Sequence, residues 1–132
     1  MGKPILCLDF DGVIHGYQSG WKGADVIDDP PVPGAMAFLI EAVEHFDVQI
    51  FSSRTHQPGG LAAMAEYVCG HLTDLIQMRC EPGLSIAAVL GGISYPKNKP
   101  PALVSIDDRA ICFTGEWPEI ETLKSFKPWN KK

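Results

Sequence analysis

Apolar residues recur along the chain with two spacings, and each spacing predicts one type of element. Short continuous apolar runs are typical of strands buried on both faces, whereas apolar positions three and four residues apart indicate a helix with one buried side. The pattern predicts strands at 4–10, 47–52, 92–95, 102–106 and 111–113, and helices at 35–46, 61–72, 84–90 and from Pro118 onward. We expect the last helix to bury Ile120, Leu123 and Phe126. Alternating strands and helices favour a parallel sheet covered by helices on both faces.

Length and composition fit one globular domain over residues 1–132. Of the residues, 45% are apolar and 20% are charged, which is too apolar for a disordered chain. No apolar run approaches the ~20 residues needed to cross a bilayer, and the stretch after Pro4 is too short for an export signal. We therefore expect a cytoplasmic protein that does not bind membranes.

The net charge limits which molecules the protein could bind, and the cysteine spacing indicates whether disulfides or a zinc site are expected. The net charge is −5, whereas a surface that follows a nucleic-acid backbone usually carries a basic excess. Extended nucleic-acid binding is therefore disfavoured, but a small phosphorylated substrate is not. The 4 cysteines include no CxxC pair, so we expect reduced, mostly buried thiols rather than disulfides or a zinc site.

Polar side chains gather where the predicted strands end. The first strand ends in Asp9-Phe10-Asp11-Gly12, the second in Ser52-Ser53-Arg54, and a late strand in Asp107-Asp108-Arg109. In open parallel sheets, ligands bind outside the carboxyl ends of the strands. We therefore expect these three segments to contribute to one site.

Three aspartates at one point favour a divalent cation. Asp9 and Asp11 lie two residues apart in an extended segment, so their side chains point to the same side. Close carboxylates repel each other unless a cation lies between them or one is protonated, and Asp107 adds a third. Mg²⁺ prefers such oxygen ligands and usually keeps several waters and a substrate phosphate. Any one of these aspartates could instead be a solubilising loop residue, but the repeated pattern favours the cation.

A phosphoryl group beside carboxylates needs compensating donors. The hydroxyl of Ser52 and the backbone N–H groups of a tight turn can bind its oxygens, and Ser53 is a neighbouring candidate. The ammonium of Lys99 can neutralise the nucleophile and the phosphate together, with Lys97 as the alternative.

Taken in order, Asp9-x-Asp11-Gly12, Ser52, Lys99 and Asp107-Asp108 resemble the four motifs of the haloacid dehalogenase (HAD) superfamily, phosphatase branch. The resemblance covers most of the chain. It implies a Rossmann-like three-layer sandwich with a central parallel sheet, and a Mg²⁺-dependent phosphatase that hydrolyses a phosphomonoester. Aspartate at position 11 is similar to the phosphatases and phosphomutases of the superfamily, whose transport ATPases have threonine there.

The resemblance also implies a role for each motif residue. Asp9 would be the nucleophile that forms an aspartyl-phosphate. Asp11 would protonate the leaving oxygen and then activate water, so its environment should shift its pKa. Asp107 would hold Mg²⁺ together with Asp9 and Asp11, the latter through its backbone carbonyl, and Asp108 would act through water or from further out.

The remaining motif residues would bind phosphate or orient the acids. By the same resemblance, Ser52 and Lys99 would hold the phosphoryl oxygens. Arg54 and Arg109 adjoin the motifs, and each is expected to orient a motif carboxylate by a salt bridge rather than to take part in the reaction.

The chain has no room for the substantial cap domain that many relatives carry. Residues 12–31 form only a short flap-like insertion, in which His15, Tyr17 and Trp21 could contact a leaving group or could pack on the sheet edge. The implied site is open. Open-site relatives tend to act on large substrates or to oligomerise, so the substrate can be a small phosphorylated molecule or a phosphorylated macromolecule, and a homo-oligomer is an option.

Several alternatives compete with this interpretation. A signalling receiver domain would place its phosphorylated aspartate at a strand end in mid-chain, where this sequence has Ser52, so it is disfavoured. A phosphotransferase or nucleotidase of the same superfamily, or a module that binds phosphate or Mg²⁺ without catalysis, would share the motifs. The sequence does not identify the physiological substrate.

Overall fold

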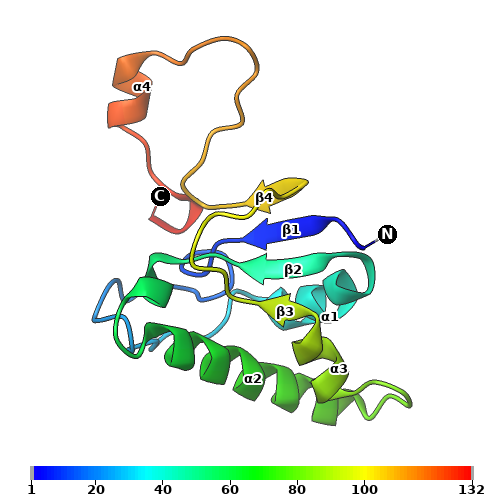
Figure 1. The fold of residues 1–132 in the computed structure, drawn as a ribbon. Coiled ribbons are helices and arrows are strands. Elements are labelled where there is room, and N and C mark those ends of the chain that lie inside the picture. The colour runs from blue at the N-terminus through cyan, green and yellow to red at the C-terminus, as the bar shows by residue number, and fades with distance from the viewer. Residues whose placement is uncertain (1, 132) are drawn as a thin grey trace.

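A computed structural model describes residues 2–131 and contains one four-stranded sheet. Its strands are β1 (Ile5–Leu8), β2 (Asp47–Ile50), β3 (Ile93–Ser94) and β4 (Val104–Ile106), in the order β3-β2-β1-β4 (Figure 1). All neighbouring strands are parallel, as the alternating pattern predicts. Because β1 lies at the centre between β2 and β4, the residues that follow these three strands meet at one edge of the sheet.

Three helices cover one face of the sheet. They are α1 (Ala35–His45), α2 (Gly60–Arg79) and α3 (Ile86–Gly91), and they contact one another. Leu6 and Leu8 of β1 pair in register with Val48 and Ile50 of β2, so the four side chains share a face. Together with α1 and α2 residues such as Leu39, Met64, Val68 and Leu72 they form one buried core. Each fully buried side chain of this size contributes about 1.5–3 kcal/mol.

The opposite face carries no helix in the described part of the chain, which differs from the expected three layers. The segment at 95–103 returns directly from β3 to β4, past the carboxyl ends of β2 and β1 (Figure 1). It contains Pro96, Pro100 and Pro101, which lack the N–H that a helix interior requires. The protein therefore has an α/β fold with a parallel sheet, and its helices pack on one side of that sheet.

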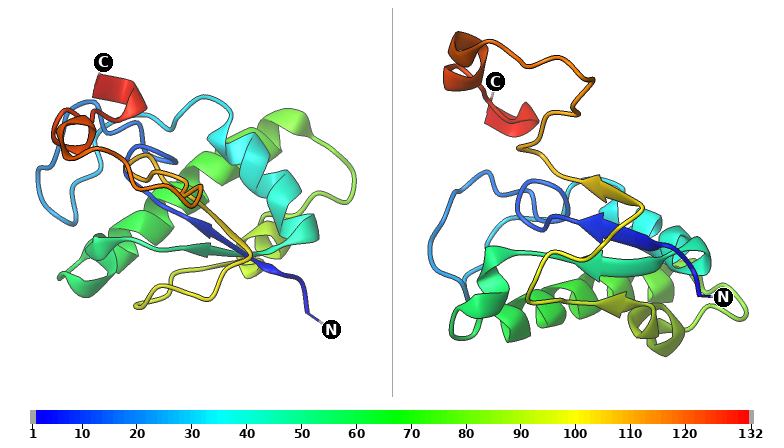
Figure 2. Two further views of the ribbon diagram at one scale, coloured as in Figure 1. Left: turned by 90° about the horizontal axis from the view of Figure 1, so that it is seen from above. Right: turned by 45° about the horizontal axis from the view of Figure 1, so that its top comes forward.

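The carboxyl-terminal part differs most from the sequence-based prediction. Residues 111–113 are not a strand, and α4 (Ile120–Lys124) is a short helix with no buried residue. Residues 109–128, here called the arm, leave the sheet after β4 and return at the 3₁₀ turn η2 (Trp129–Lys131); Figures 1 and 2 show the arm projecting from the rest of the molecule. The apolar side chains predicted to be buried, Ile120, Leu123 and Phe126, are exposed.

Two further expectations concern membrane-spanning helices and the state of the cysteines. Within residues 2–131, no helix is both long enough and apolar enough to cross a bilayer. The four cysteines are free thiols, but the expectation that they are mostly buried is wrong: Cys7 is buried, Cys69 is half-buried, and Cys80 and Cys112 are exposed.

Candidate active site

Three carboxylates meet where β1 and β4 end. The strands are paired from Leu6 with Val104 to Leu8 with Ile106, and the pairing continues as the Asp9 N–H donates to the Ile106 carbonyl at 3.0 Å. One carboxylate oxygen each from Asp9, Asp107 and Asp108 therefore falls within 4.8 Å of the others. Adjacent parallel strands bring together residues nearly a hundred positions apart.

The environment of this acidic cluster favours a positive charge. Burial raises the pKa of Asp9 to about 8, and the hydrogen bond with Asp108 and the negative charge of Asp107 act in the same direction, while the Phe10 N–H opposes them. Oδ1 of Asp108 is buried without a hydrogen-bond partner. Three oxygen ligands with one unsatisfied buried oxygen fit a hard divalent cation such as Mg²⁺.

Gly12 allows Asp108 to approach the cluster. Its φ is +85°, and a Cβ atom at this position would lie 2.2 Å from Oδ2 of Asp108. Any side chain here would therefore collide with the carboxylate and strain the backbone. The glycine of the DxDG motif thus has a steric role against a residue of the late strand.

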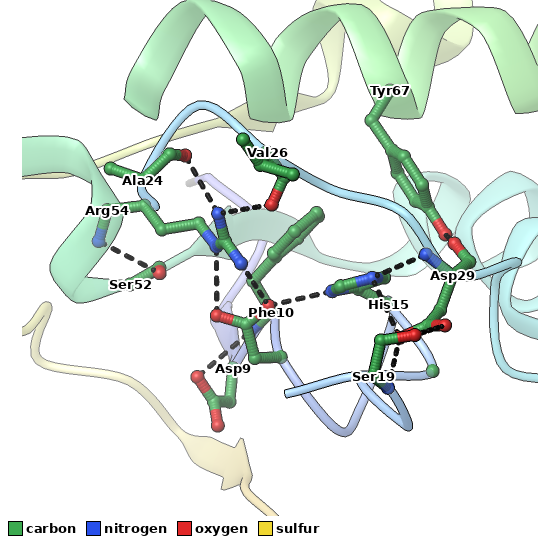
Figure 3. Close-up of polar contacts among 12 residues, drawn as sticks. Asp9, Phe10, His15, Ser19, Ala24, Val26, Asp29, Ser52, Arg54 and Tyr67 are labelled. Carbon is green, nitrogen blue, oxygen red and sulfur yellow. Dashed lines mark hydrogen bonds and ion pairs between the residues drawn. The ribbon is translucent and has the colours of Figure 1, made fainter. Parts of the chain in front are cut away.

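The carboxylate of Asp11 is not one of the three that form the cluster and instead makes an ion pair with Arg54, whose side chain Figure 3 shows. It accepts hydrogen bonds from Nε and Nη2 of Arg54 at 2.9 and 3.0 Å and from Nδ1 of His15 at 2.8 Å. Burial alone would raise the pKa of Asp11, but these two partners outweigh it and hold the pKa below its usual value. The structure brings Asp9 and Asp107 together and adds Asp108 to the cluster, whereas the Asp11 carboxylate forms an ion pair with Arg54. The expected cation ligand from Asp11 is its backbone carbonyl, and that role stays a prediction.

Arg54 connects the strand ends to the insertion at 12–31. Its side chain is fully buried, and Nη1 donates to the carbonyls of Gly23, Ala24 and Val26 at 2.9, 2.8 and 3.2 Å. The guanidinium lies 4.6 Å from the centre of the Trp21 ring. Arg54 does orient a motif carboxylate, and its fork of donors also fixes the loop above the site.

His15 is a buried link rather than a contact for a leaving group. It is 1% exposed, and its Nε2 accepts the Asp29 N–H at 3.1 Å, so the ring proton lies on Nδ1 and is donated to Asp11. Phe10 stacks on the ring with centroids 5.7 Å apart. Of the two roles considered for His15, contact with a leaving group is therefore not favoured, and its side chain instead orients Asp11.

Sequence reasoning missed two residues that complete this network. The Tyr67 hydroxyl, on α2, donates to the Asp29 carbonyl at 2.8 Å, and the Asp29 carboxylate accepts from both the backbone N–H and the hydroxyl of Ser19 (Figure 3). In the sequence, Tyr67 looks like any other residue of a predicted helix, and Asp29 looks like an acidic residue of a loop. Neither has a local signal, because both act through residues distant in sequence.

The predicted phosphate-binding residues are at the same edge but are not gathered on the cluster. Ser52 is buried, and its Oγ accepts the Arg54 N–H at 3.1 Å at the start of the 3₁₀ turn η1 (Ser53–His56). Ser53, Lys97 and Lys99 are exposed. Within residues 2–131, no ion pair joins either lysine to an acid of the cluster, so the choice between Lys97 and Lys99 stays open.

Arg109 contributes its backbone rather than its side chain. Its N–H donates to Oδ1 of Asp107 at 2.8 Å and so helps to orient that carboxylate. The expected salt bridge is not among the ion pairs of the described residues.

The end of the chain closes one side of the site. Nε1 of Trp129 donates to the Gly12 carbonyl at 2.8 Å, and Nδ2 of Asn130 donates to the Gly16 carbonyl at 3.0 Å. Trp129 also borders a cavity of about 220 Å³ that reaches Asp107 and Asp108. The turn η2 thus holds the loop that follows β1.

The arrangement presents two kinds of carboxylate side by side: a crowded cluster suited to a cation, and an ionised Asp11 fixed by Arg54 and His15. A scan against protein-family models and searches of curated proteins and of solved structures found no match to this chain. We therefore infer function from the geometry of the site and from the motifs.

Proposed function

We propose that this protein is a Mg²⁺-dependent phosphatase of the HAD type, which hydrolyses a phosphomonoester through an aspartyl-phosphate on Asp9. The observation that carries the proposal is the approach of Asp9, Asp107 and Asp108 to within 4.8 Å beside an ionised Asp11. The strand order supports it as well, because the proposed nucleophile follows the central strand and the Asp107-Asp108 pair follows its neighbour.

Asp9 would attack the phosphorus atom through a carboxylate oxygen as the bond to the leaving oxygen breaks. Water would then attack phosphorus, return the carboxylate and release inorganic phosphate, so that one difficult hydrolysis becomes two easier displacements. Mg²⁺ held by Asp9, Asp107 and Asp108 would neutralise charge on the carboxylates and on the phosphoryl oxygens.

Asp11 is suited to the second displacement. As a carboxylate it can take a proton from the attacking water. In the first displacement it would have to be protonated, and its two hydrogen-bond donors oppose this. We therefore expect substrates with good leaving groups, such as p-nitrophenyl phosphate, to react much faster than alkyl phosphates.

Ser52 and the lysines would bind the phosphoryl oxygens. The Ser52 oxygen already accepts one hydrogen bond, and its own O–H is free to donate. Lys99 and Lys97 lie on the 95–103 segment, which passes the strand ends, and a long exposed side chain there can swing toward the site (Figure 1). Ser53 is the neighbouring hydroxyl.

The test is hydrolysis of a panel of phosphate esters by the purified protein, with Mg²⁺ and with a chelator. We expect turnover of p-nitrophenyl phosphate that requires Mg²⁺ and that D9N lowers at least about 10³-fold, since it removes the nucleophile. The matched control is D74N, an exposed aspartate on α2, which should keep wild-type activity. Absence of hydrolysis across the panel, or an active D9N, would overturn the proposal.

One observation favours a second candidate, a module that binds phosphate and Mg²⁺ without catalysis. The ion pair of Asp11 with the buried Arg54 is what a site that never protonates Asp11 would have. This alternative predicts saturable Mg²⁺ binding by calorimetry with no turnover of any ester. A phosphotransferase would instead show phosphate release that falls when an acceptor alcohol is added.

A further inference from the structure

The arm exposes an unusual amount of apolar surface. Six large apolar side chains between residues 111 and 126 are 39–86% exposed, namely Ile111, Phe113, Trp117, Ile120, Leu123 and Phe126. With side chains of this size, the six expose on the order of 800 Å² together, whereas contiguous apolar patches on monomers rarely exceed a few hundred Å². A standard protein interface buries about 800 Å² from each partner, so the arm has the area that a stable dimer needs.

The apolar side chains of the arm border a hollow. The hollow has a volume of about 880 Å³ and is lined by Ile111, Phe113, Pro118, Ile120 and Leu123 among others. Trp117, which also borders the hollow, is 86% exposed. Its ring lies against Phe113 with the centroids 4.8 Å apart. An exposed apolar rim around a hollow fits a two-fold contact, in which the rims of two copies pack against each other.

Charges at residues 116–127 of the arm are segregated by sign, with Glu116, Glu119 and Glu121 before Lys124 and Lys127. Among the described residues, the exposed Glu121–Lys124 pair at 3.5 Å is the one ion pair that joins the two groups. When the two-fold axis is perpendicular to this segment, the two copies of it run antiparallel. The acidic half of one copy then faces the basic half of the other, which favours the correct partner and register.

We propose that two copies of this chain form a dimer through their arms, with Trp117 of each copy at the centre of the interface. The dimer buries the apolar residues that the fold of a single chain leaves in water. It does not depend on the proposed phosphatase activity, because none of the arm residues belongs to the acidic cluster.

The first test is the molecular mass in solution, measured by sedimentation velocity and by light scattering from about 1 to about 100 µM protein. We expect wild-type protein to be a dimer. W117E should raise the dissociation constant about 30-fold or more, because a buried aromatic anchor is lost and a charge is placed in the interface. The matched control is M78E, since Met78 is 76% exposed on α2 and outside the arm; it should leave the dimer intact. Circular dichroism and thermal unfolding confirm that both variants fold.

A charge exchange tests the antiparallel arrangement. E116K/E119K/E121K/K124E/K127E exchanges the two charged groups and should still dimerise, because opposite charges face each other in two antiparallel copies. Mixed with wild type it should form no heterodimer, because like charges would then meet. Monomeric wild-type protein at every concentration, or a folded W117E that dimerises like wild type, would overturn the proposed dimer. Heterodimers between wild type and the charge-exchanged variant would overturn the antiparallel arrangement.

Discussion

Asp11 is held as a carboxylate by two neighbours, one four residues away and one 43 residues away. Arg54 is fully buried, so its charge is compensated only by Asp11 and by backbone carbonyls. Breaking a buried pair by removing one partner is costly, because the other charge stays buried. This one side chain therefore supports the fold as well as the proposed chemistry.

Replacing Asp11 with asparagine should lower the free energy of unfolding, and the loss should depend on pH. A carboxyl whose pKa is lowered by folding stabilises the protein above its unfolded pKa of about 3.9, and the contribution is lost as the pH falls through the lower folded value. We expect D11N to lower the free energy of unfolding by ~3 kcal/mol near neutral pH, and by less below about pH 4. Urea unfolding at both pH values measures the difference.

The control for this prediction is D74N, which makes the same change on the exposed surface of α2 and should leave the free energy of unfolding almost unchanged. A D11N variant as stable as wild type near neutral pH would contradict the structural role of the ion pair.

At the scale of elements, the turn η2 stabilises the loop after β1. Trp129 and Asn130 reach carbonyls more than a hundred residues earlier in the chain. We expect W129F, which keeps a ring but removes the N–H donor, to speed amide hydrogen exchange in residues 12–18 about 2- to 10-fold, the effect of one neutral hydrogen bond. Exchange measured by mass spectrometry checks this. W117F removes a tryptophan with no hydrogen bond in the arm and should leave exchange at 12–18 unchanged.

The hydrophobic pattern predicted the elements of the sheet and its helices well. The apolar runs that became β1 and β2, and the three- and four-residue spacing that became α1 and α2, are local properties of each segment. The same pattern failed at residues 111–113 and at α4. Spacing indicates that one side of a segment is apolar, but not which surface will cover it, and here the covering surface is outside the fold of a single chain.

At the scale of the whole molecule, we expect the acidic cluster to couple cation binding to folding. The pKa of Asp9 is raised to about 8 in the protein without a cation. A carboxyl whose pKa is raised by folding contributes stability below its unfolded value of about 3.9, and that contribution is lost as the pH rises through the folded pKa. Without a cation, the protein should therefore become less stable from weakly acidic pH to about pH 8.

Mg²⁺ should reverse this loss. A ligand that binds only the folded state adds about 2.7 kcal/mol at a concentration 100 times its Kd, and binding here requires ionised carboxylates, so the gain in Tm should be larger near pH 8 than near pH 6. Thermal unfolding with Mg²⁺ and with a chelator measures it. D107N should abolish the gain and D74N should keep it; an unchanged Tm in wild type at either pH would contradict cation binding at the cluster.

The sequence alone determined the segments that form β1, β2, α1 and α2, and it placed Asp9, Ser52 and Asp107 at strand ends that a parallel sheet brings to one edge. Those properties depend on neighbours within a few residues. Only the tertiary structure decided which carboxylates face each other: Asp11 turns toward Arg54, Asp108 enters the cluster against Gly12, and His15 is buried. The direction of a side chain beyond a strand end depends on partners tens of residues away, which hydrophobic spacing does not record.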